Sequence, residues 1–188
     1  LDDGPPADYF DLVIIDEAHH APAKTWTAIL EYFSTGRSLL LTATPHRRDG
    51  KRLPGKLAYY YPLRQALEEG LYQPVQPLVV EAPSGATRGD MDVLIRDNVL
   101  EILREPAHAD SQLIVRAGTR ARATELATLY SEEGLEIPVL HSGFGSARQR
   151  SVIDGLRSGD HRGVAMVGML VEGFDLPRLR IAAYHDKH

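Results

Sequence analysis

Two adjacent carboxylates, Asp16 and Glu17, directly follow a continuous apolar, β-branched segment at residues 12–15. Such a segment is typical of a strand buried on both faces of a parallel sheet, and this strand would deliver both acids to a crevice at its carboxyl end. Mg²⁺ binds carboxylate oxygens, and a second carboxylate beside metal-bound phosphates can orient and deprotonate an attacking water. We predict that Asp16 holds the metal and Glu17 activates water to hydrolyse a phosphoanhydride.

A second interpretation of the same acids stays open. Acidic side chains are favoured at helix N-termini, so Asp16 and Glu17 could simply cap the helix expected to start near Pro22. A four-residue motif taken alone has a high false-positive rate. The choice between a catalytic and a capping role therefore depends on the elements and motifs around the acids.

Strand and helix patterns alternate along the chain, which predicts an α/β fold with doubly wound parallel sheets. The carboxyl ends of such strands share one edge of the sheet, where ligands bind. A proline-punctuated stretch at residues 74–83 marks the expected domain boundary. Helices are expected at residues 22–33, 63–69, 91–104, 120–133 and 147–157, and strands at 12–15, 39–41, 78–80, 113–115, 137–140, 164–167 and 181–184.

The composition limits the classes of protein to which the chain can belong. Its 188 residues are 43% hydrophobic, enough for a real core, and its 26 acidic against 21 basic side chains give a net charge of -5. Contact with nucleic acid must therefore be local. The absence of cysteine excludes disulfides and thiolate metal sites. Neither a membrane-spanning run nor a signal peptide is found in the sequence, so we expect a cytoplasmic protein.

Five motifs occur in the order of one known family. Asp16-Glu17-Ala18-His19 resembles motif II of the DEAD/DEAH-box helicases of superfamily 2, and Thr42-Ala43-Thr44-Pro45 resembles their motif III. Further on, Gly118-Thr119-Arg120 resembles motif IV, and His141-Ser142-Gly143 with Arg148 resembles a segment of the second motor lobe. Residues 169–177 resemble motif V. The residues of motifs III and V are similar to those of the restriction-subunit and DNA-repair branch of the family.

The resemblance implies two RecA-like lobes with ATP and Mg²⁺ between them and movement on nucleic acid driven by hydrolysis. Residues 1–74 would be the C-terminal part of the first, ATP-binding lobe, and residues 75–188 a truncated second lobe. The implied roles are catalysis for Asp16, Glu17 and His19, coupling for Thr42 and Thr44, nucleotide binding for Gly173 and Asp175, and sequence-independent binding of nucleic-acid phosphates for Thr119, Ser142 and Gly143.

Ordinary structural roles are the alternative for several of these residues. Thr42 and Thr44 are β-favouring residues at the end of a strand, and Thr119 and Ser142 are of the types that cap helices. A metal-hydrolase site built from His19, His185 and His188 with the acids has no supporting His-Glu-x-x-His helix.

The chain also departs from the family pattern. It contains no Gly-rich phosphate loop before Asp16 and no arginine motif after motif V, so we expect a fragment that is inactive alone. In motif V, Val167-Gly168 stands where a polar pair is usual. The predicted function is an ATP-dependent DNA helicase or translocase, acting with possible nuclease or regulatory domains outside the chain. An RNA helicase and a helicase-like scaffold without ATPase activity are the alternatives.

Overall fold

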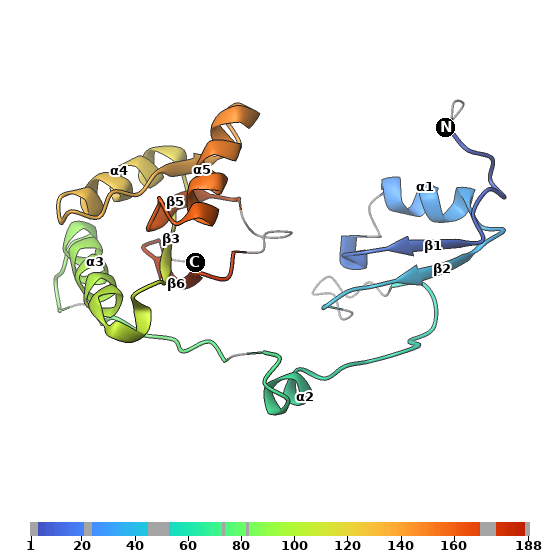
Figure 1. Ribbon diagram of the computed structural model, residues 1–188, viewed down its shortest axis with the longest axis horizontal. Helices are drawn as coiled ribbons and strands as arrows, with labels where there is room; N and C mark the ends of the chain where they lie inside the picture. The colour runs from blue at the N-terminus through green and yellow to red at the C-terminus, as the bar shows by residue number, and fades with distance from the viewer. Residues whose placement is uncertain are drawn as a thin grey trace. The chain divides into compact units, whose positions relative to one another are not determined.

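The computed structural model describes residues 4–20, 24–44, 53–72, 74–81, 83–169 and 176–186. The chain divides into two compact units, Leu1–Val75 and Gln76–His188 (Figure 1). Each unit has its own parallel sheet. Within the described parts of the chain, no helix is long and apolar enough to cross a membrane.

The first unit is built on two parallel strands, β1 (Leu12–Ile15) and β2 (Arg37–Leu40). Parallel strands need a crossover, which here contains the 3-10 helix η1 (Ala18–His20) and the helix α1 (Lys24–Tyr32). Gly36 directly precedes β2, and a Cβ at this position would lie 2.4 Å from the carbonyl oxygen of Phe10. Only glycine therefore lets β2 approach the start of β1 this closely.

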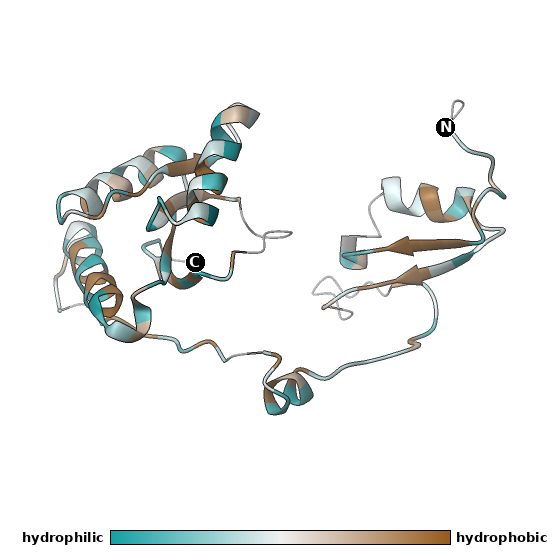
Figure 2. Ribbon diagram, viewed as in Figure 1, coloured by the Kyte–Doolittle hydropathy of each residue, from teal (hydrophilic) through white to brown (hydrophobic). Residues whose placement is uncertain are grey.

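The prediction that β1 is buried on both faces is wrong for the described residues. Val13 and Ile15 pack with Leu30 of α1 on one face of the strand, as alternation along a strand requires. Leu12 and Ile14 point the other way and are 50% and 56% exposed. Within the part of the chain that the structure describes, a helix therefore covers only one face of this apolar strand (Figure 2).

The second unit is a four-stranded parallel sheet with helices on both faces, which confirms the predicted α/β class (Figure 1). One face carries α3 (Arg88–Arg104) and α4 (Arg120–Ser131), and the other carries α5 (Ser146–Ser158). The strand order is β4 (Val139–His141), β5 (Gly163–Val167), β3 (Gln112–Arg116), β6 (Leu179–Tyr184).

The alternation of side chains along the central strands builds two separate cores. Leu113 of β3 packs with Leu126 and Tyr130 of α4, and all three are 0% exposed. Val164 of β5 points to the opposite face and packs with Leu156 of α5. Both faces of β3 and β5 are therefore filled, as expected for central strands of a doubly wound sheet.

The segment between the two sheets contains the helix α2 (Leu63–Glu68), and the short 3-10 helix η2 (Pro106–His108) precedes β3. The predicted strand at residues 78–80 is wrong, because residues 74–81 contain neither helix nor strand. Leu78 and Val79 are 61% and 78% exposed. Pro74 and Pro77 lack the N–H groups that a paired strand must donate, so apolar residues alone do not make a strand here.

Helix α3 begins at Arg88, three residues before the predicted start at Met91, because a capping box fixes its N-terminus. The hydroxyl of Thr87 accepts from the Asp90 backbone N–H at 3.2 Å, and the Asp90 carboxylate accepts from the Thr87 N–H at 2.8 Å. The two residues satisfy two of the amides that a helix start leaves without partners.

Replacement of the capping residue should destabilise the second unit. We expect Thr87→Ala to lower the free energy of unfolding by about 1 kcal/mol, because the Asp90 amide loses its acceptor. Denaturant unfolding followed by circular dichroism measures the change, and Thr128→Ala, at an exposed position within α4, serves as the control. Equal effects of the two substitutions would contradict the capping role.

Candidate functional site

The two carboxylates of the first unit lie just beyond the end of β1, as predicted. Asp16 and Glu17 are exposed, and Asp16 Oδ1 accepts a hydrogen bond of 2.8 Å from the Glu17 N–H. Glu17 has φ 50°, which makes it the one described residue other than glycine with positive φ. This left-handed conformation costs about 1 kcal/mol or more for a residue with a side chain. The chain therefore turns sharply directly after the strand, and both acids are accessible at its carboxyl end.

Ala18 fixes the acidic loop to the neighbouring strand. Its side chain is 0% exposed and packs with Ile15. Its N–H donates to the carbonyl oxygen of Leu41 at 2.9 Å, directly after β2. A larger side chain at this buried position would push the acidic loop away from the segment that follows β2.

This pairing brings motifs II and III into contact. His19 Nδ1 lies 3.2 Å from Thr42 Oγ1 and 3.3 Å from Glu17 Oε2, so one imidazole spans the water-activating candidate and the second loop. The Thr42 hydroxyl also accepts from the Thr44 N–H at 3.1 Å. The four candidate residues Glu17, His19, Thr42 and Thr44 thus form one connected group.

The donor set suits Mg²⁺ bound together with phosphates. Mg²⁺ uses one or two carboxylates, substrate phosphate oxygens and several waters, and it rarely needs a cage made wholly of protein. Asp16 offers one exposed carboxylate at the edge of the sheet. Among the described residues, no three His, Asp or Glu side chains gather to hold a metal, so the histidine-based metal-hydrolase alternative has no support there. His188 lies outside the described residues.

The predicted phosphate contacts of the second unit lie in the loops that follow β3 and β4. Thr119 caps α4, because its hydroxyl accepts from the Arg122 N–H at 3.2 Å. Ser142 and Gly143 are exposed in the turn after β4, where the Gly143 N–H donates to His141 Nδ1 at 3.0 Å. The nucleotide-binding candidates Gly173 and Asp175 lie outside the described residues.

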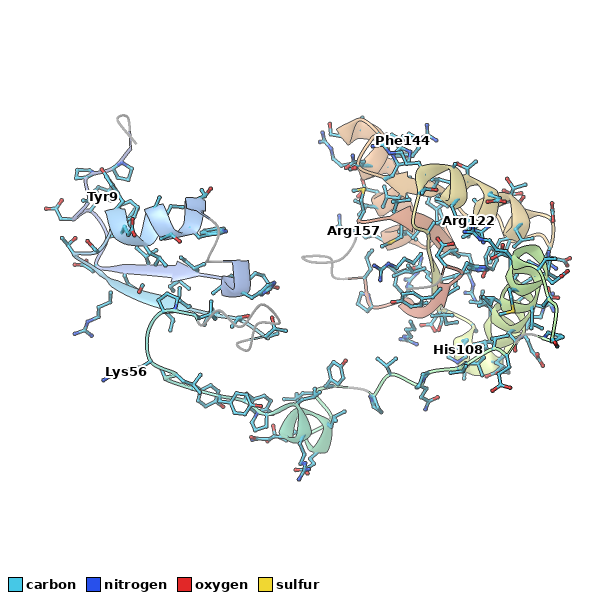
Figure 3. The ribbon with its side chains drawn as sticks, turned by 180° about the vertical axis from the view of Figure 1, so that it is seen from behind. Tyr9, Lys56, His108, Arg122, Phe144 and Arg157 are labelled. Carbon is cyan, nitrogen blue, oxygen red and sulfur yellow. The ribbon has the colours of Figure 1, made fainter. Side chains whose placement is uncertain are left out.

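A buried polar cluster behind these loops was not predicted. Its members Asp92 of α3, Arg122 of α4 and His185 after β6 are 5%, 6% and 8% exposed (Figure 3 labels Arg122). Arg122 pairs with Asp92, and His185 Nδ1 lies 2.9 Å from the same Asp92 oxygen. On its other side, His185 Nε2 lies 3.1 Å from the hydroxyl of the fully buried Tyr130. An ionised carboxylate only accepts, so His185 donates through Nδ1 and accepts from Tyr130 through Nε2.

The cluster continues to the surface through Asp186. Its carboxylate accepts from the Gly118 N–H at 2.7 Å, from Arg122 Nε at 3.3 Å and from Arg88. Burial raises the pKa of Asp186, but these donors outweigh burial and hold the pKa below its ordinary value. Asp186 is therefore ionised and ties the end of β6 to the loop before α4.

Burial and hydrogen bonding have opposite effects on other members. Burial lowers the pKa of His185 more than its hydrogen bond to Asp92 raises it. Burial also raises the pKa of Tyr130. Burial would lower the pKa of Arg122, but its hydrogen bonds to Asp92 and Glu125 raise the pKa above the ordinary value. The Arg122–Asp92 ion pair at the centre of the cluster thus lies beside an imidazole whose pKa is lowered.

Several known proteins are similar to this chain. The family model "Type III restriction enzyme, res subunit" matches residues 2–47. The type I restriction enzyme EcoAI endonuclease subunit of Escherichia coli is 36% identical over 80 residues, which cover 39% of this chain and 10% of that protein. The UvrABC system protein B of Mycobacterium leprae (strain TN) is 30% identical over 152 residues, covering 80% of this chain and 20% of that protein. The chain thus spans a tenth to a fifth of the length of these relatives.

Solved structures show the same fold. Saccharomyces cerevisiae Dbp5 bound to RNA and ADP BeF3 matches with a TM-score of 0.56 and 17% sequence identity, over 94% of this chain and 44% of that one. These sequence similarities support the resemblance of the chain to the superfamily 2 helicases. The RecA-like fold expected from the resemblance is confirmed, and the matches to restriction subunits agree with the expected branch.

The buried histidine of the second unit should make the stability of the chain depend on pH. The pKa of His185 lies below its ordinary value of 6.5, so the unfolded chain binds a proton that the folded chain does not. The free energy of unfolding should keep its full value above pH 6.5 and decrease as the pH falls below it.

Urea unfolding at several pH values measures this effect. We expect His185→Leu to weaken the loss of stability between neutral and mildly acidic pH, and His108→Gln, at a half-buried position, to leave the loss unchanged. A His185→Leu chain with the pH dependence of the original would show that the buried imidazole is not the group responsible.

Proposed function

We propose that the chain is the catalytic and coupling part of an ATP-dependent DNA helicase or translocase. The observation that carries the proposal is the contact of His19 with both Glu17 and Thr42, at 3.3 Å and 3.2 Å. This contact joins Glu17, which is suited to water activation, to the loop of Thr42, which can respond to a change at Glu17. A helix cap would need no such connection.

In this proposal the acids divide the chemistry between them. Asp16 holds Mg²⁺, which neutralises charge on the phosphates of ATP when bound. Glu17 orients the attacking water and accepts its proton. The backbone hydrogen bond from Ala18 to Leu41 holds the loop that carries Glu17, so the Glu17 carboxylate starts from a fixed backbone position. Gly173 and Asp175 of motif V are proposed to contact the nucleotide.

His19, Thr42 and Thr44 are proposed to couple hydrolysis to movement. Loss of the γ-phosphate changes what Glu17 binds, and the imidazole of His19 passes this change to the Thr42 hydroxyl. Thr42 in turn holds the Thr44 amide at 3.1 Å. A shift at Glu17 therefore reaches the backbone of motif III through three successive contacts, from Glu17 to His19, from His19 to Thr42 and from Thr42 to the Thr44 amide.

The proposed substrate is DNA, bound through its phosphates without base reading. Thr119, Ser142 and Gly143 are proposed contacts in the second unit. The threonine that opens motif III, Thr42, and the similarity to restriction-enzyme subunits support DNA over RNA. Nuclease or regulatory domains elsewhere in the whole protein would be partners of this motor.

The test is the ATPase activity of the whole protein that contains the chain. Glu17→Gln should lower kcat for nucleic-acid-stimulated ATP hydrolysis by roughly 100-fold or more, because the amide cannot accept the proton. Binding of ATP should persist, since the substitution keeps the size of the side chain. Glu31→Gln, at an exposed position on α1, makes the same chemical change away from the site and should leave kcat unchanged.

An ATPase rate that is equal in the Glu17→Gln and Glu31→Gln proteins would remove Glu17 from the mechanism. A whole protein that binds nucleic acid but hydrolyses no ATP would instead favour the alternative of a scaffold without ATPase activity. The Val167-Gly168 pair, which stands where motif V usually has polar residues, is the sequence feature that motivates this alternative.

A further inference from the structure

The two halves of α3 are attached to the second unit in different ways. The last turns of the helix place three buried apolar side chains in the core around β3, namely Val99, Leu100 and Leu103. Ile95 is the first side chain of the helix that packs against this core. Among residues 88–94, all of which the structure describes, Asp92 is the one buried side chain. The first two turns of α3 are therefore held by a carboxylate and the last turns by apolar contacts.

Charged and polar side chains of other elements hold these first two turns in place. The Asp92 carboxylate pairs with the guanidinium of Arg122 on α4, and the same oxygen lies 2.9 Å from His185 Nδ1 beyond the end of β6. At the first residue of the helix, Arg88 forms an ion pair with Asp186. The first two turns are thus attached at Arg88 and Asp92, and an ion pair contributes to both attachments.

Release of these two attachments exposes charge rather than apolar surface. The Arg88 and Asp92 side chains would pass into water, which solvates charged groups well. Arg122 would stay paired, because its Nη1 lies 3.0 Å from Glu125 Oε2. Release of the last turns would instead open the apolar core to water, which is unfavourable in proportion to the apolar area exposed. The part of α3 that can be released most easily therefore ends before Ile95.

The chain enters α3 directly from the segment that connects the two sheets (Figure 1). Residues 74–81 and 83–87 of this connecting segment contain neither helix nor strand. A helix of seven residues is not stable by itself in water, so the first two turns would unwind when released. Residues 88–94 span about 10 Å as a helix and up to about 23 Å when extended, so unwinding would add about 13 Å to the connecting segment.

We infer that residues 88–94 form a releasable extension of the connecting segment, with Asp92 as the residue that holds them on the second unit. Release lengthens the connection between the two units by local unfolding, while the core of the second unit stays intact. The contacts of Asp92 set how often the extension opens, and the apolar contacts that begin at Ile95 set where the opening stops. The inference goes beyond the proposed function, because the opening takes place within the second unit and needs no ATP.

Native-state hydrogen exchange of the chain, followed by NMR for each amide in dilute urea, tests the inference. The amides of residues 91–94 should share one opening equilibrium and one urea dependence, because they are released together. That opening should be at least about 10-fold more frequent than the opening that exposes the amides of residues 99–103. Simple fraying of the helix end would instead give exchange rates that fall steadily from residue 91 to residue 94.

Substitutions in the two halves of α3 should have different effects on this exchange. Asp92→Asn weakens contacts made only in the closed state, so it should accelerate exchange of both groups of amides by the same factor, at least about 10-fold. Val99→Ala weakens contacts that persist after release, so it should accelerate exchange at residues 99–103 and leave exchange at residues 91–94 unchanged. The matched control is Glu125→Gln, which removes an exposed carboxylate from the same guanidinium and should change exchange by less than about 3-fold.

Three results would overturn the inference: rates that fall steadily over residues 91–94, equal acceleration of both groups of amides by Val99→Ala, or equal effects of Asp92→Asn and Glu125→Gln. The first result is measured on the unchanged chain, so the inference stays testable if a variant fails to fold. None of the measurements involves ATP or nucleic acid. Failure of this inference and failure of the proposed function are therefore distinguishable.

Discussion

The parallel pairing of β1 with β2 is the interaction on which the candidate ATPase site depends. It continues past both strands, through the Leu41 N–H to the Ile15 carbonyl at 2.9 Å and the Ala18 N–H to the Leu41 carbonyl at 2.9 Å. His19 and Thr42 are 23 residues apart in the sequence, yet this pairing leaves them within hydrogen-bond distance. Without it, the acidic loop and the threonine loop would be separate surface turns with no common chemistry.

The same geometric rule shapes the second unit and divides its loops by charge. Parallel strands bring all their carboxyl ends to one edge of the sheet. At the β3 and β6 ends, Asp186 forms ion pairs with Arg88 and Arg122 and accepts a hydrogen bond from the Gly118 amide. At the β4 end, Arg148 lies over the ring of Phe144 and Arg120 lies next to Gly143. The charged groups of the loop before α4 are therefore paired within the chain, whereas the turn after β4 carries two arginines.

Much of the fold could be predicted from the sequence, because periodic apolar residues report local structure directly. The strands at residues 113–115 and 164–167 and the helix at 147–157 lie within observed elements or match them closely. The strand at residues 78–80 failed, because an apolar run shows hydrophobicity but not the presence of a neighbouring strand to pair with. The early start of α3 was missed because Thr87 and Asp90 act through a local capping box rather than through periodicity.

The candidate site residues also differ in whether the sequence could reveal them. Asp16, Glu17, His19 and Thr42 could be found because their order matches known motifs. The cluster of Asp92, Tyr130, Arg122 and His185 could not, because its members are polar residues in separate elements and only the tertiary fold reveals that they are buried together. The pairing of Arg120 with Gly143 is likewise invisible in sequence, since it depends on how α4 packs against the sheet.

We propose that motifs II and III act as one unit through the contact of His19 with Thr42. A double-mutant cycle of His19→Ala and Thr42→Val in the whole protein, read out as nucleic-acid stimulation of ATP hydrolysis, tests it most directly. We predict that each single substitution reduces stimulation and that the double substitution is no worse than the more severe single one, which corresponds to a coupling free energy of about 0.5–3 kcal/mol. Reductions that simply add, with no coupling free energy, would contradict the claim.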